Sequence, residues 1–558
     1  GSPIVERLKS DIKGEFPKYS GSGTIIVKID SIKRESLPAI NDDDWDPENH
    51  RARAAKRSQR IYELMEEKLL ETPIPDQEIE ETSQPNLSKA TISLRPHQQR
   101  AITKWKQNNF KGIIQHATGS GKTITALTCI EEHVKTGLPA LILVPGRELL
   151  DQWIREVERF IPDSDILAAG DNHDEWRKNL TFWTNRRKQK TSKRIVIAII
   201  HTARTELFLQ SVGDLDNCLV IIDECHRIGA PSYQGVCSWN PSKVMGLSAT
   251  PTRYSDEIGT ENMKELCGEI LDEYSIDEAI RDGYLSKYFY YIERVGLTNK
   301  HPKCETADCK QCETNDYDLK MEEIKKSLRR YKEKDGGINF SELPEGLKIM
   351  IFNAKRIIKS AYQKTQRCAE IVEYNYTDDG TQFWLVYCED RNQLFDVKEA
   401  LRLIGKGPVY EYWSEAEGAE TDSKKLKFDR RATLEMWEST GGIMLAIDCL
   451  DEGVNIPCIS HGIILASSQN PRQFVQRRGR LLRLSQNKRF AHIWDTLVVP
   501  ESELGGEHTN YVLAEIKRSN IFAKNASNYQ ALREIQNITF ELGLNSESDV
   551  DAIEADEV

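Results

Sequence analysis

The chain has 558 residues, of which 39% are hydrophobic and 29% are charged, and it carries a formal net charge of −12. At roughly 150 residues per domain, this length predicts three or four folding units. The acidic balance argues against a simple basic coat for nucleic acid, but it is compatible with a local basic channel. The longest apolar runs, at 138–145 and 195–200, fall far short of the ~18–20 residues that span a bilayer, so we expect no membrane association.

The first part of the chain, residues 1–90, is predicted to be an accessory segment that ends in a linker. Residues 41–49 are acidic, residues 50–71 have helical periodicity, and residues 72–86 are acidic and rich in proline. These patterns do not indicate a role for the segment.

Residues 91–289 alternate apolar strands with helical stretches, and the same pattern returns in residues 379–540. Continuous Val, Ile and Leu runs separated by helices indicate a parallel sheet that is covered on both faces. The sequence therefore predicts an α/β protein with two parallel-sheet domains of similar size. The expected strands are 111–118, 138–145, 194–200, 218–224 and 243–250 in the first domain, and 381–390, 408–413, 442–448, 461–468 and 489–495 in the second.

Two further segments complete the predicted organisation. Residues 290–378 are charged and largely helical, and we expect them to form an insert between the two domains. Residues 541–558 are acidic, and we expect a solvated tail.

Residues 116–123 read HATGSGKT and lie between an expected strand and an expected helix. They fit the phosphate-loop pattern G-x4-G-K-[ST] except at the first glycine, where His116 stands. Glycines let backbone N–H groups curl around phosphate oxygens, and the helix N-terminus adds a favourable dipole. We expect Lys122 to reach the outer phosphates of a nucleotide and Thr123 to hold Mg²⁺; the alternative is an ordinary polar turn. The predicted nucleotide-binding residues of this loop are Thr118, Gly119, Ser120, Gly121, Lys122 and Thr123.

A second chemical signal is the carboxylate pair Asp223-Glu224, which ends the apolar strand LVIIDE. Asp223 is expected to hold Mg²⁺ through water, and Glu224 is expected to position and deprotonate an attacking water. The alternative is a solvated acidic turn. The phosphate loop in the same expected sheet argues against that alternative.

With these motifs and others in the same order, the chain resembles the superfamily 2 nucleic-acid helicases and translocases. The resemblance covers roughly residues 91–300 and 380–500, and it implies two RecA-like domains that use ATP and Mg²⁺. The other matching motifs are LRPHQ (94–98), SAT (248–250), EGVNIP (452–457) and QRRGRLLR (476–483).

The resemblance also implies roles for individual residues. Arg95 would stack on adenine and Gln98 would hydrogen-bond its edge, while Arg480 and Arg483 would act as arginine fingers across a cleft between the domains. Spacings of four and three residues place both arginines on one helix face with Gln476, a third expected catalytic residue. The remaining implied residues are Gly453 and Asn455 at the nucleotide, and His226, Ser248 and Thr250 in coupling ATP to nucleic acid.

The nucleic-acid face follows from the same resemblance. LVPGRELLDQW (143–153) and IIHTA (199–203) look like phosphate-contacting motifs, so we expect contacts from Pro145, Arg147 and Thr202. The basic stretches 184–194 and 324–334 would extend this track, although a solvated charged surface explains them as well.

Residues 301–312 read HPKCETADCKQC, an exception to the cysteines that are otherwise scattered through apolar segments. His301, Cys304, Cys309 and Cys312 have a spacing compatible with structural Zn²⁺, with Cys368 or Cys267 as substitutes for His301. The alternatives are an exposed loop with chance cysteines and, less readily, a nuclease motif formed by His301, Lys303 and Asp308. The scattered cysteines favour a reducing compartment, the cytoplasm or, in a eukaryote, the nucleus.

The sequence thus predicts an ATP-dependent helicase or translocase. The form of its motifs resembles the branch of type III restriction subunits and repair helicases, which favours double-stranded or branched DNA. Two alternatives stay open: an ATP-gated clamp or sensor that serves a nuclease or other effector protein, and an RNA helicase.

Overall fold

The structure is a computed structural model, and the residues that it describes belong to one compact unit, Ser93–Val558. They are residues 93–171, 173–185, 192–213, 215–253, 256–298, 312–331, 343–413, 430–447, 459–466, 477–485, 488, 490–499 and 509–541.

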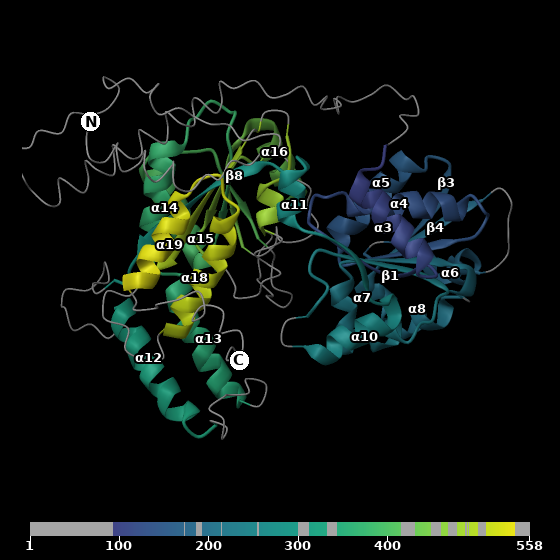
Figure 1. Cartoon of the computed structure of the whole chain (residues 1–558), viewed down its shortest axis with the longest axis horizontal. Coiled ribbons are helices and arrows are strands. Elements are labelled where there is room, and N and C mark those ends of the chain that lie inside the picture. The colour runs from purple at the N-terminus through teal and green to yellow at the C-terminus, as the bar shows by residue number, and fades with distance from the viewer. Residues whose placement is uncertain are drawn as a thin grey trace, which may run out of the picture. The chain divides into compact units, whose positions relative to one another are not determined.

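The first lobe is built on a seven-stranded sheet in the order β3-β4-β2-β5-β6-β1-β7, with every neighbouring pair parallel (Figure 1). Because the strands are parallel, all of their carboxyl ends meet at one edge of the sheet, where the motif loops emerge. The strands are β1 (Lys111–His116), β2 (Ala140–Val144), β3 (Ser164–Ala169), β4 (Lys193–Ile199), β5 (Leu219–Asp223), β6 (Lys243–Ser248) and β7 (Ile270–Tyr274).

Both faces of this sheet are buried, which explains its continuous apolar strands. In β2, Leu141 and Leu143 pack into one hydrophobic cluster, while Ala140, Ile142 and Val144 pack into another on the opposite face. The second of these faces is covered by α3 (Pro96–Gln107), α4 (Lys122–Val134) and α5 (Arg147–Phe160). The first is covered by α6 (Trp176–Thr184), α7 (Ile200–Ala203), α8 (Glu206–Ser211), α9 (Gln234–Cys237) and α10 (Glu257–Cys267).

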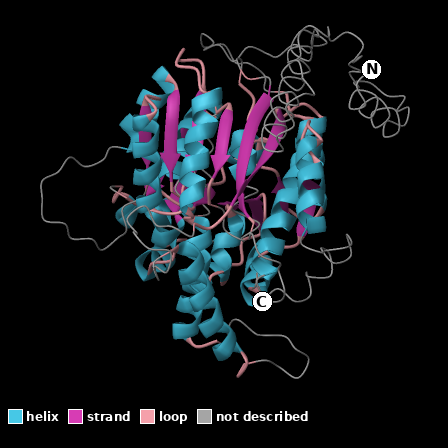
Figure 2. Ribbon diagram, turned by 90° about the vertical axis from the view of Figure 1, so that its left-hand side faces the viewer, coloured by secondary structure: helices cyan, strands magenta, loops and turns pink. Residues whose placement is uncertain are grey.

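The second lobe has a six-stranded parallel sheet in the order β10-β11-β9-β12-β13-β8, and helices flank its strands (Figure 2). Its strands are β8 (Lys287–Val295), β9 (Phe383–Tyr387), β10 (Val409–Tyr412), β11 (Gly442–Ala446), β12 (His461–Ile464) and β13 (Phe490–Val498). One face packs on α14 (Tyr362–Asn375) and α15 (Arg391–Leu403). The other packs on α11 (Ile276–Arg281), α16 (Arg430–Thr440), α18 (Thr509–Lys524) and α19 (Gln530–Glu541). The two sheets confirm the predicted fold class.

The helical insert forms a hairpin of α12 (Glu313–Leu328) and α13 (Glu345–Lys359), which projects from the second lobe (Figure 1). Tyr317 and Ile324 of α12 pack against Leu347 and Ala354 of α13, in a hydrophobic cluster that also includes Val295 at the end of β8. The expected boundary between residues 289 and 290 falls within β8, because the chain already joins the second sheet at Lys287.

The outer edge of β8 is covered by the loop that joins α18 to α19. The side-chain amide of Asn528 accepts a hydrogen bond from the backbone N–H of Tyr290 and donates one to its carbonyl, both at 2.8 Å. The backbone N–H of Ser527 donates to the carbonyl of Tyr288 at 2.8 Å. The loop therefore satisfies backbone groups that a further strand would otherwise pair with.

Among the described helices, none is long and apolar enough to span a lipid bilayer.

Candidate functional site

The phosphate-loop residues connect the end of β1 to the start of α4. Gly119 and Gly121 have φ angles of 84° and 93°, in the left-handed region that favours glycine. A Cβ atom on Gly121 would also lie 2.5 Å from Nε2 of Gln98, so the loop could not accept a larger residue there without a shift. The buried hydroxyl of Ser120 donates to the carbonyl of Ala117 at 2.7 Å and closes the turn.

Lys122 is the first residue of α4, and its Nζ donates to the carbonyl of His116 at 2.9 Å. Burial lowers the pKa of Lys122, against the opposing effect of the carboxylates Glu224 and Asp223. A phosphate group here would add negative charge beside this half-buried ammonium.

His116, which replaces the first glycine of the phosphate-loop pattern, joins β1 to the edge strand β7. Its Nε2 lies 2.9 Å from Oδ2 of the buried Asp272, a carboxylate that also binds Arg100 and Lys104 of α3. Burial alone would raise the pKa of Asp272, but its hydrogen bonds to Arg100, Lys104 and His116 lower it to about 2. The loop is therefore anchored at His116 by the ion-pair cluster of Asp272 with Arg100 and Lys104.

Asp223 and Glu224 lie at the carboxyl end of β5, which is separated from β1 by β6. Oδ1 of Asp223 accepts the backbone N–H of Glu224 at 3.0 Å, and its Oδ2 accepts the indole N–H of Trp153 at 2.8 Å. Glu224 has a φ of 46°, an uncommon conformation for a residue with a side chain. Such strained backbone is often found at functional positions.

The predicted coupling residues lie next to Glu224. Oγ of Ser248, at the end of β6, lies 3.5 Å from Oε2 of Glu224 and 3.1 Å from Nδ1 of His226. The same hydroxyl accepts the backbone N–H of Thr250 at 3.1 Å. A change at the Glu224 carboxylate would therefore reach the SAT segment through direct contacts.

The two predicted adenine-motif residues have different surroundings. The guanidinium of Arg95 lies 4.3 Å from the ring centroid of Tyr284, in a cation–π geometry. The amide of Gln98 is buried, and it accepts from the backbone N–H of Arg95 at 2.9 Å and donates to the carbonyl of Gly121 at 3.0 Å. In this arrangement Gln98 supports the phosphate loop, whereas Arg95 faces the pocket described next.

Side chains from both lobes line one pocket of about 340 Å³, which we call the Lys122 pocket. The first lobe contributes Lys122, Thr123, Asp223 and Glu224, and the second lobe contributes arginines from residues 477–485. These arginines are Arg480 and Arg483, and the remaining lining residues are Arg95, Thr118, Gly119, Gly121, Ile124, Leu149, Gln152, Glu156, Tyr284 and Leu484.

The four arginines at 477–483 make different contacts. Arg480 and Arg483 line the Lys122 pocket, and burial, reinforced by the charge of Arg480, lowers the pKa of Arg483. Arg477 donates to the carbonyl of Ala466, and Arg478 forms an ion pair with Asp277.

Gly479 lets this segment approach the phosphate loop closely. A Cβ atom on Gly479 would lie 2.6 Å from Cβ of Thr118, so a larger residue would force the two segments apart. Gln476, the third predicted catalytic residue of the segment, lies outside the described residues.

The predicted nucleic-acid contacts lie at the same edge of the first sheet, after β2 and β4. Pro145 is buried, whereas Arg147 is exposed and forms an ion pair with Asp171 at 2.9 Å. Oγ1 of Thr202 lies near Gly170, since a Cβ atom placed there would be 2.9 Å from it. Arg147 and Thr202 thus both lie beside the loop that follows β3.

Several residues around the Lys122 pocket were not predicted from the sequence. Leu149, Gln152 and Glu156 come from one face of α5 with i, i+3, i+7 spacing, and the first two lie within the 143–153 motif, which did not single them out. Trp153 ends the 143–153 motif, which did not single it out, and both Trp153 and Tyr284 reach the site by tertiary packing.

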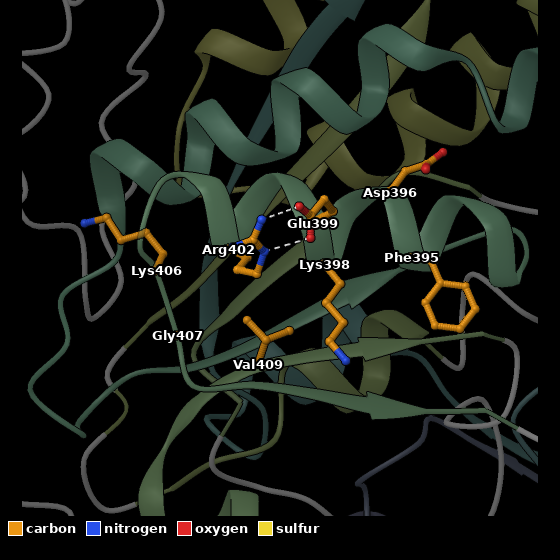
Figure 3. A pocket seen from close by; sticks show the side chains of 8 residues that line it. All are labelled: Phe395, Asp396, Lys398, Glu399, Arg402, Lys406, Gly407 and Val409. Atoms are coloured by element: carbon orange, nitrogen blue, oxygen red, sulfur yellow. Dashed lines mark hydrogen bonds and ion pairs between the residues drawn. The ribbon is translucent and has the colours of Figure 1, made fainter.

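A second pocket, of about 520 Å³, lies between α15 and β10 in the second lobe (Figure 3). Its cations already have partners: Arg402 pairs with Glu399, and Lys398 pairs with Glu411. None of the predicted site residues lines it, so it offers no support for the predicted chemistry. The lining residues are Phe395, Asp396, Lys398, Glu399, Arg402, Lys406, Gly407 and Val409.

The predictions for Gly453 and Asn455 fall outside the described residues, as do those for His301, Cys304 and Cys309. Of the predicted zinc ligands of the cluster, Cys312 alone is described, and it is buried at the start of α12. The two proposed substitutes, Cys267 and Cys368, are buried in separate hydrophobic clusters of the first and second lobes. Within the described part of the chain, no group of three or more His, Cys, Asp or Glu residues has the arrangement of a metal site.

Two family profiles match the chain. The profile described as type III restriction enzyme, res subunit, matches residues 91–253, and the helicase conserved C-terminal domain matches residues 363–485. The first match contains the phosphate loop and the Asp223-Glu224 pair, and the second contains Arg480 and Arg483.

Individual relatives agree with the profiles. The DNA 3'-5' translocase XPB2 of Sulfurisphaera tokodaii is 25% identical over 403 residues, which cover 71% of this chain and 80% of that protein. Protein 055L of Frog virus 3 is 30% identical over 172 residues, which cover 30% of this chain and 36% of that protein.

Among solved structures, the ATP-dependent type ISP restriction-modification enzyme LlaBIII bound to DNA shares the fold over 82% of this chain and 33% of its own, with a TM-score of 0.51 and 14% sequence identity. This chain therefore spans only about a third of the length of that enzyme and of protein 055L. Together, the order of the motifs, the two profile matches and the relatives identify the chain as a member of the superfamily 2 helicases and translocases, which hydrolyse ATP, in their branch of type III restriction subunits and repair helicases.

Proposed function

We propose that this chain hydrolyses ATP in the Lys122 pocket and uses the cycle to move along double-stranded or branched DNA. The observation that carries the proposal is that Lys122 and Glu224 of the first lobe line the same pocket as Arg480 and Arg483 of the second. A triphosphate bound there would draw the lobes together, and hydrolysis would release them. Two lobes that grip a strand in turn form a stepping motor.

In this proposal each pocket residue has a defined task. Lys122 binds the outer phosphates, Glu224 orients the attacking water and accepts its proton, and Arg480 and Arg483 stabilise the negative charge that develops in the transition state. Thr123 and Asp223, which both line the pocket, offer the hard oxygen ligands that suit Mg²⁺. The ion would neutralise phosphate charge when the nucleotide is bound.

Two comparisons favour DNA as the substrate. The relative from Sulfurisphaera tokodaii is named a DNA translocase, and the type ISP enzyme with the same fold is described as bound to DNA. The exposed guanidinium of Arg147 and the hydroxyl of Thr202 are suited to backbone phosphates rather than to base edges, so we expect little sequence preference.

The test is the ATPase rate of the whole chain with single-stranded, duplex and forked DNA and with RNA, combined with strand displacement on a forked duplex and displacement of a bound protein roadblock from duplex DNA. We expect the strongest stimulation by duplex or forked DNA, together with ATP-dependent displacement of strand or roadblock. Stimulation without either displacement would indicate a clamp that serves another effector, and stronger stimulation by RNA would indicate an RNA helicase. Lys122→Ala serves as the control, since turnover that survives this change would come from a contaminant or from another site.

Three finer proposals accompany this function. We propose that any strand cleavage linked to the motor is supplied by a partner nuclease, because the sequence shows no convincing nuclease motif. The cysteines buried in apolar cores, such as Cys129 and Cys218, favour a reducing cytoplasmic or nuclear location. Structural zinc at residues 301–312 predicts about one zinc per chain, and unchanged metal content in Cys304→Ser would contradict it.

A further inference from the structure

Trp153 lies in the middle of α5, and its indole N–H donates to Oδ2 of Asp223 at 2.8 Å. The indole is 1% exposed and packs in the hydrophobic cluster between the first sheet and helices α3, α4 and α5. Since the other carboxylate oxygen of Asp223 accepts the backbone N–H of Glu224, the plane of this carboxylate is fixed at two points.

An indole is chemically suited to hold a carboxylate that must also bind a cation. It donates one hydrogen bond and accepts none, and it carries no charge. A lysine or arginine at this place would neutralise Asp223 and weaken its attraction for Mg²⁺. Trp153 instead orients the carboxylate and leaves its full negative charge in a poorly solvated site, where charge-assisted hydrogen bonds are strong.

Helix α5 connects the predicted nucleic-acid contact at Arg147 with the Lys122 pocket. Arg147, a predicted nucleic-acid contact, is the first residue of α5, and Trp153 follows six residues later, or about 9 Å along the helix axis. Leu149, Gln152 and Glu156 of α5 line the Lys122 pocket. A shift of α5 on nucleic-acid binding would therefore move the group that orients Asp223.

We propose that Trp153 is a positioning residue that fixes the Asp223 carboxylate for the metal–nucleotide complex, and that α5 carries nucleic-acid binding at Arg147 to this carboxylate. The inference rests on the proposed function, because it concerns the same pocket and the same reaction.

The experiment compares Trp153→Phe with a matched control, Trp105→Phe. Trp105 lies in the same hydrophobic cluster, is similarly buried, and donates its indole N–H to the backbone carbonyl of Val244, also at 2.8 Å. Both variants lose one ring and one buried hydrogen bond, but only one of them loses the contact to Asp223. A third variant, with benzothienylalanine at position 153, keeps the shape of tryptophan without its N–H and covers the case in which the phenylalanine variant does not fold.

Metal binding provides a readout that does not depend on turnover. Electron paramagnetic resonance of Mn²⁺ with the protein and ADP measures the metal affinity, and the Mg²⁺ dependence of the ATPase rate measures its use. We expect Trp153→Phe and the benzothienylalanine variant to need about tenfold more metal for half-saturation, as is typical when an outer-shell partner of a metal ligand is removed. We expect Trp105→Phe to bind metal like the wild type, and we expect DNA to stimulate the Trp153 variants less than the wild type.

Equal metal affinity in the Trp153 and Trp105 variants would overturn the positioning role. Weaker metal binding with unchanged stimulation by DNA would overturn the link through α5. These outcomes are distinct from a failure of the proposed function, in which the wild-type chain binds metal and ADP yet shows no ATP turnover stimulated by nucleic acid.

Discussion

Two neighbouring carboxylates at the end of β5 have different surroundings. Asp223 is nearly buried and held at both oxygens, whereas Glu224 is partly exposed and lies beside the hydroxyl of Ser248 and the imidazole of His226. A fixed carboxylate suits a metal ligand, and a carboxylate in contact with groups that exchange protons suits a general base. The two adjacent acids can therefore perform different tasks because their neighbours differ.

Glu224→Gln is expected to lower the rate of ATP hydrolysis by about 10²- to 10⁴-fold, the usual contribution of a general base. Nucleotide affinity should change little, because the amide has the same shape and the phosphate contacts come from other residues. Single-turnover hydrolysis and nucleotide titration measure the two effects separately. Glu269→Gln, at an exposed carboxylate of the same lobe, is the control, and an undiminished rate in Glu224→Gln would remove this residue from the mechanism.

The residue scale also shows what sequence patterns can and cannot predict about a site. Lys122, Asp223 and Glu224 were predicted because a phosphate loop and a strand-end acid pair are defined by short local patterns. Trp153 and Tyr284 were not predicted, because Trp153 contacts Asp223 through the packing of a helix and Tyr284 lines the Lys122 pocket from an interlobe connection, and packing leaves no fixed spacing in the sequence.

At the scale of elements, the arginines of segment 477–483 make two kinds of contact, some with the Lys122 pocket and some within the second lobe. Arg480 and Arg483 face the Lys122 pocket, whereas Arg478 pairs with Asp277 and lies over the rings of Tyr288 and Phe522. The first kind of contact should affect turnover, and the second should affect stability.

We expect Arg480→Ala to lower kcat by about 10³-fold or more, as loss of an arginine finger does, with little change in Tm. Arg478→Ala should instead lower the free energy of unfolding by roughly 1–3 kcal/mol, because the variant loses the hydrogen bond and ion pair that the buried Arg478 makes with Asp277. Steady-state ATPase assays and thermal melts of both variants test this contrast. A similar profile in the two variants would contradict the division of work.

His133, near the end of α4, gives a prediction for the dependence of stability on pH. Its Nε2 lies 3.1 Å from the carbonyls of both Pro139 and Asn217, and burial, assisted by the charge of Lys243, lowers its pKa to about 4. The unfolded chain, with a histidine pKa near ~6.5, therefore binds this proton at higher pH than the folded chain does. This contribution to stability is complete above about pH 6.5 and is lost as the pH falls toward 4.

His133→Gln removes that titration while keeping an N–H donor for the carbonyls. The urea midpoint of the wild type should fall more steeply than that of the variant between pH 7 and pH 5, so the gap between the two should narrow with acidity. Parallel midpoints across this range would show that His133 does not titrate as its burial implies.

The elements themselves were predictable to different degrees. Strands in the middle of the sheets, such as β2 and β5, are buried on both faces, so their unbroken apolar runs identified them. The strands β3, β7 and β8 lie at sheet edges and mix polar with apolar residues, so periodicity did not reveal them. In β7 the reason is specific, because Asp272 is a buried charge that depends on Arg100, Lys104 and His116 from other elements.

At the scale of the whole molecule, the described lobes meet through a continuous hydrophobic cluster as well as through the Lys122 pocket. Ala117 of the phosphate loop and Leu285 after α11 belong to the same cluster as Leu481 and Leu482 beside the arginines. The backbone N–H of Ser286 donates to the carbonyl of Leu482 at 2.7 Å. The phosphate loop and the arginine segment thus pack on one hydrophobic cluster, so a movement of one would directly displace residues that contact the other.

Nucleic-acid binding by a chain with a net charge of −12 must come from a local track, and salt provides its test. If the track holds backbone phosphates, the logarithm of the affinity for duplex DNA should fall linearly with the logarithm of the salt concentration. Arg147→Ala should weaken binding to all sequences alike and reduce this slope by about one. Fluorescence anisotropy over a range of salt concentrations measures the slope, and an unchanged slope would remove Arg147 from the track.

The amide of Asn528 has a consequence for how copies of this protein behave toward each other. A strand such as β8, nine residues long and rich in tyrosine and phenylalanine, would be a ready template for cross-molecular pairing if its outer backbone were open. The Asn528 amide makes the two hydrogen bonds to Tyr290 that a residue of a neighbouring strand would make, and it thereby ends the sheet at β8. Loss of this amide would leave the backbone N–H and C=O of Tyr290 open to pairing, and we expect the effect to be seen first as self-association of concentrated protein rather than as loss of catalysis.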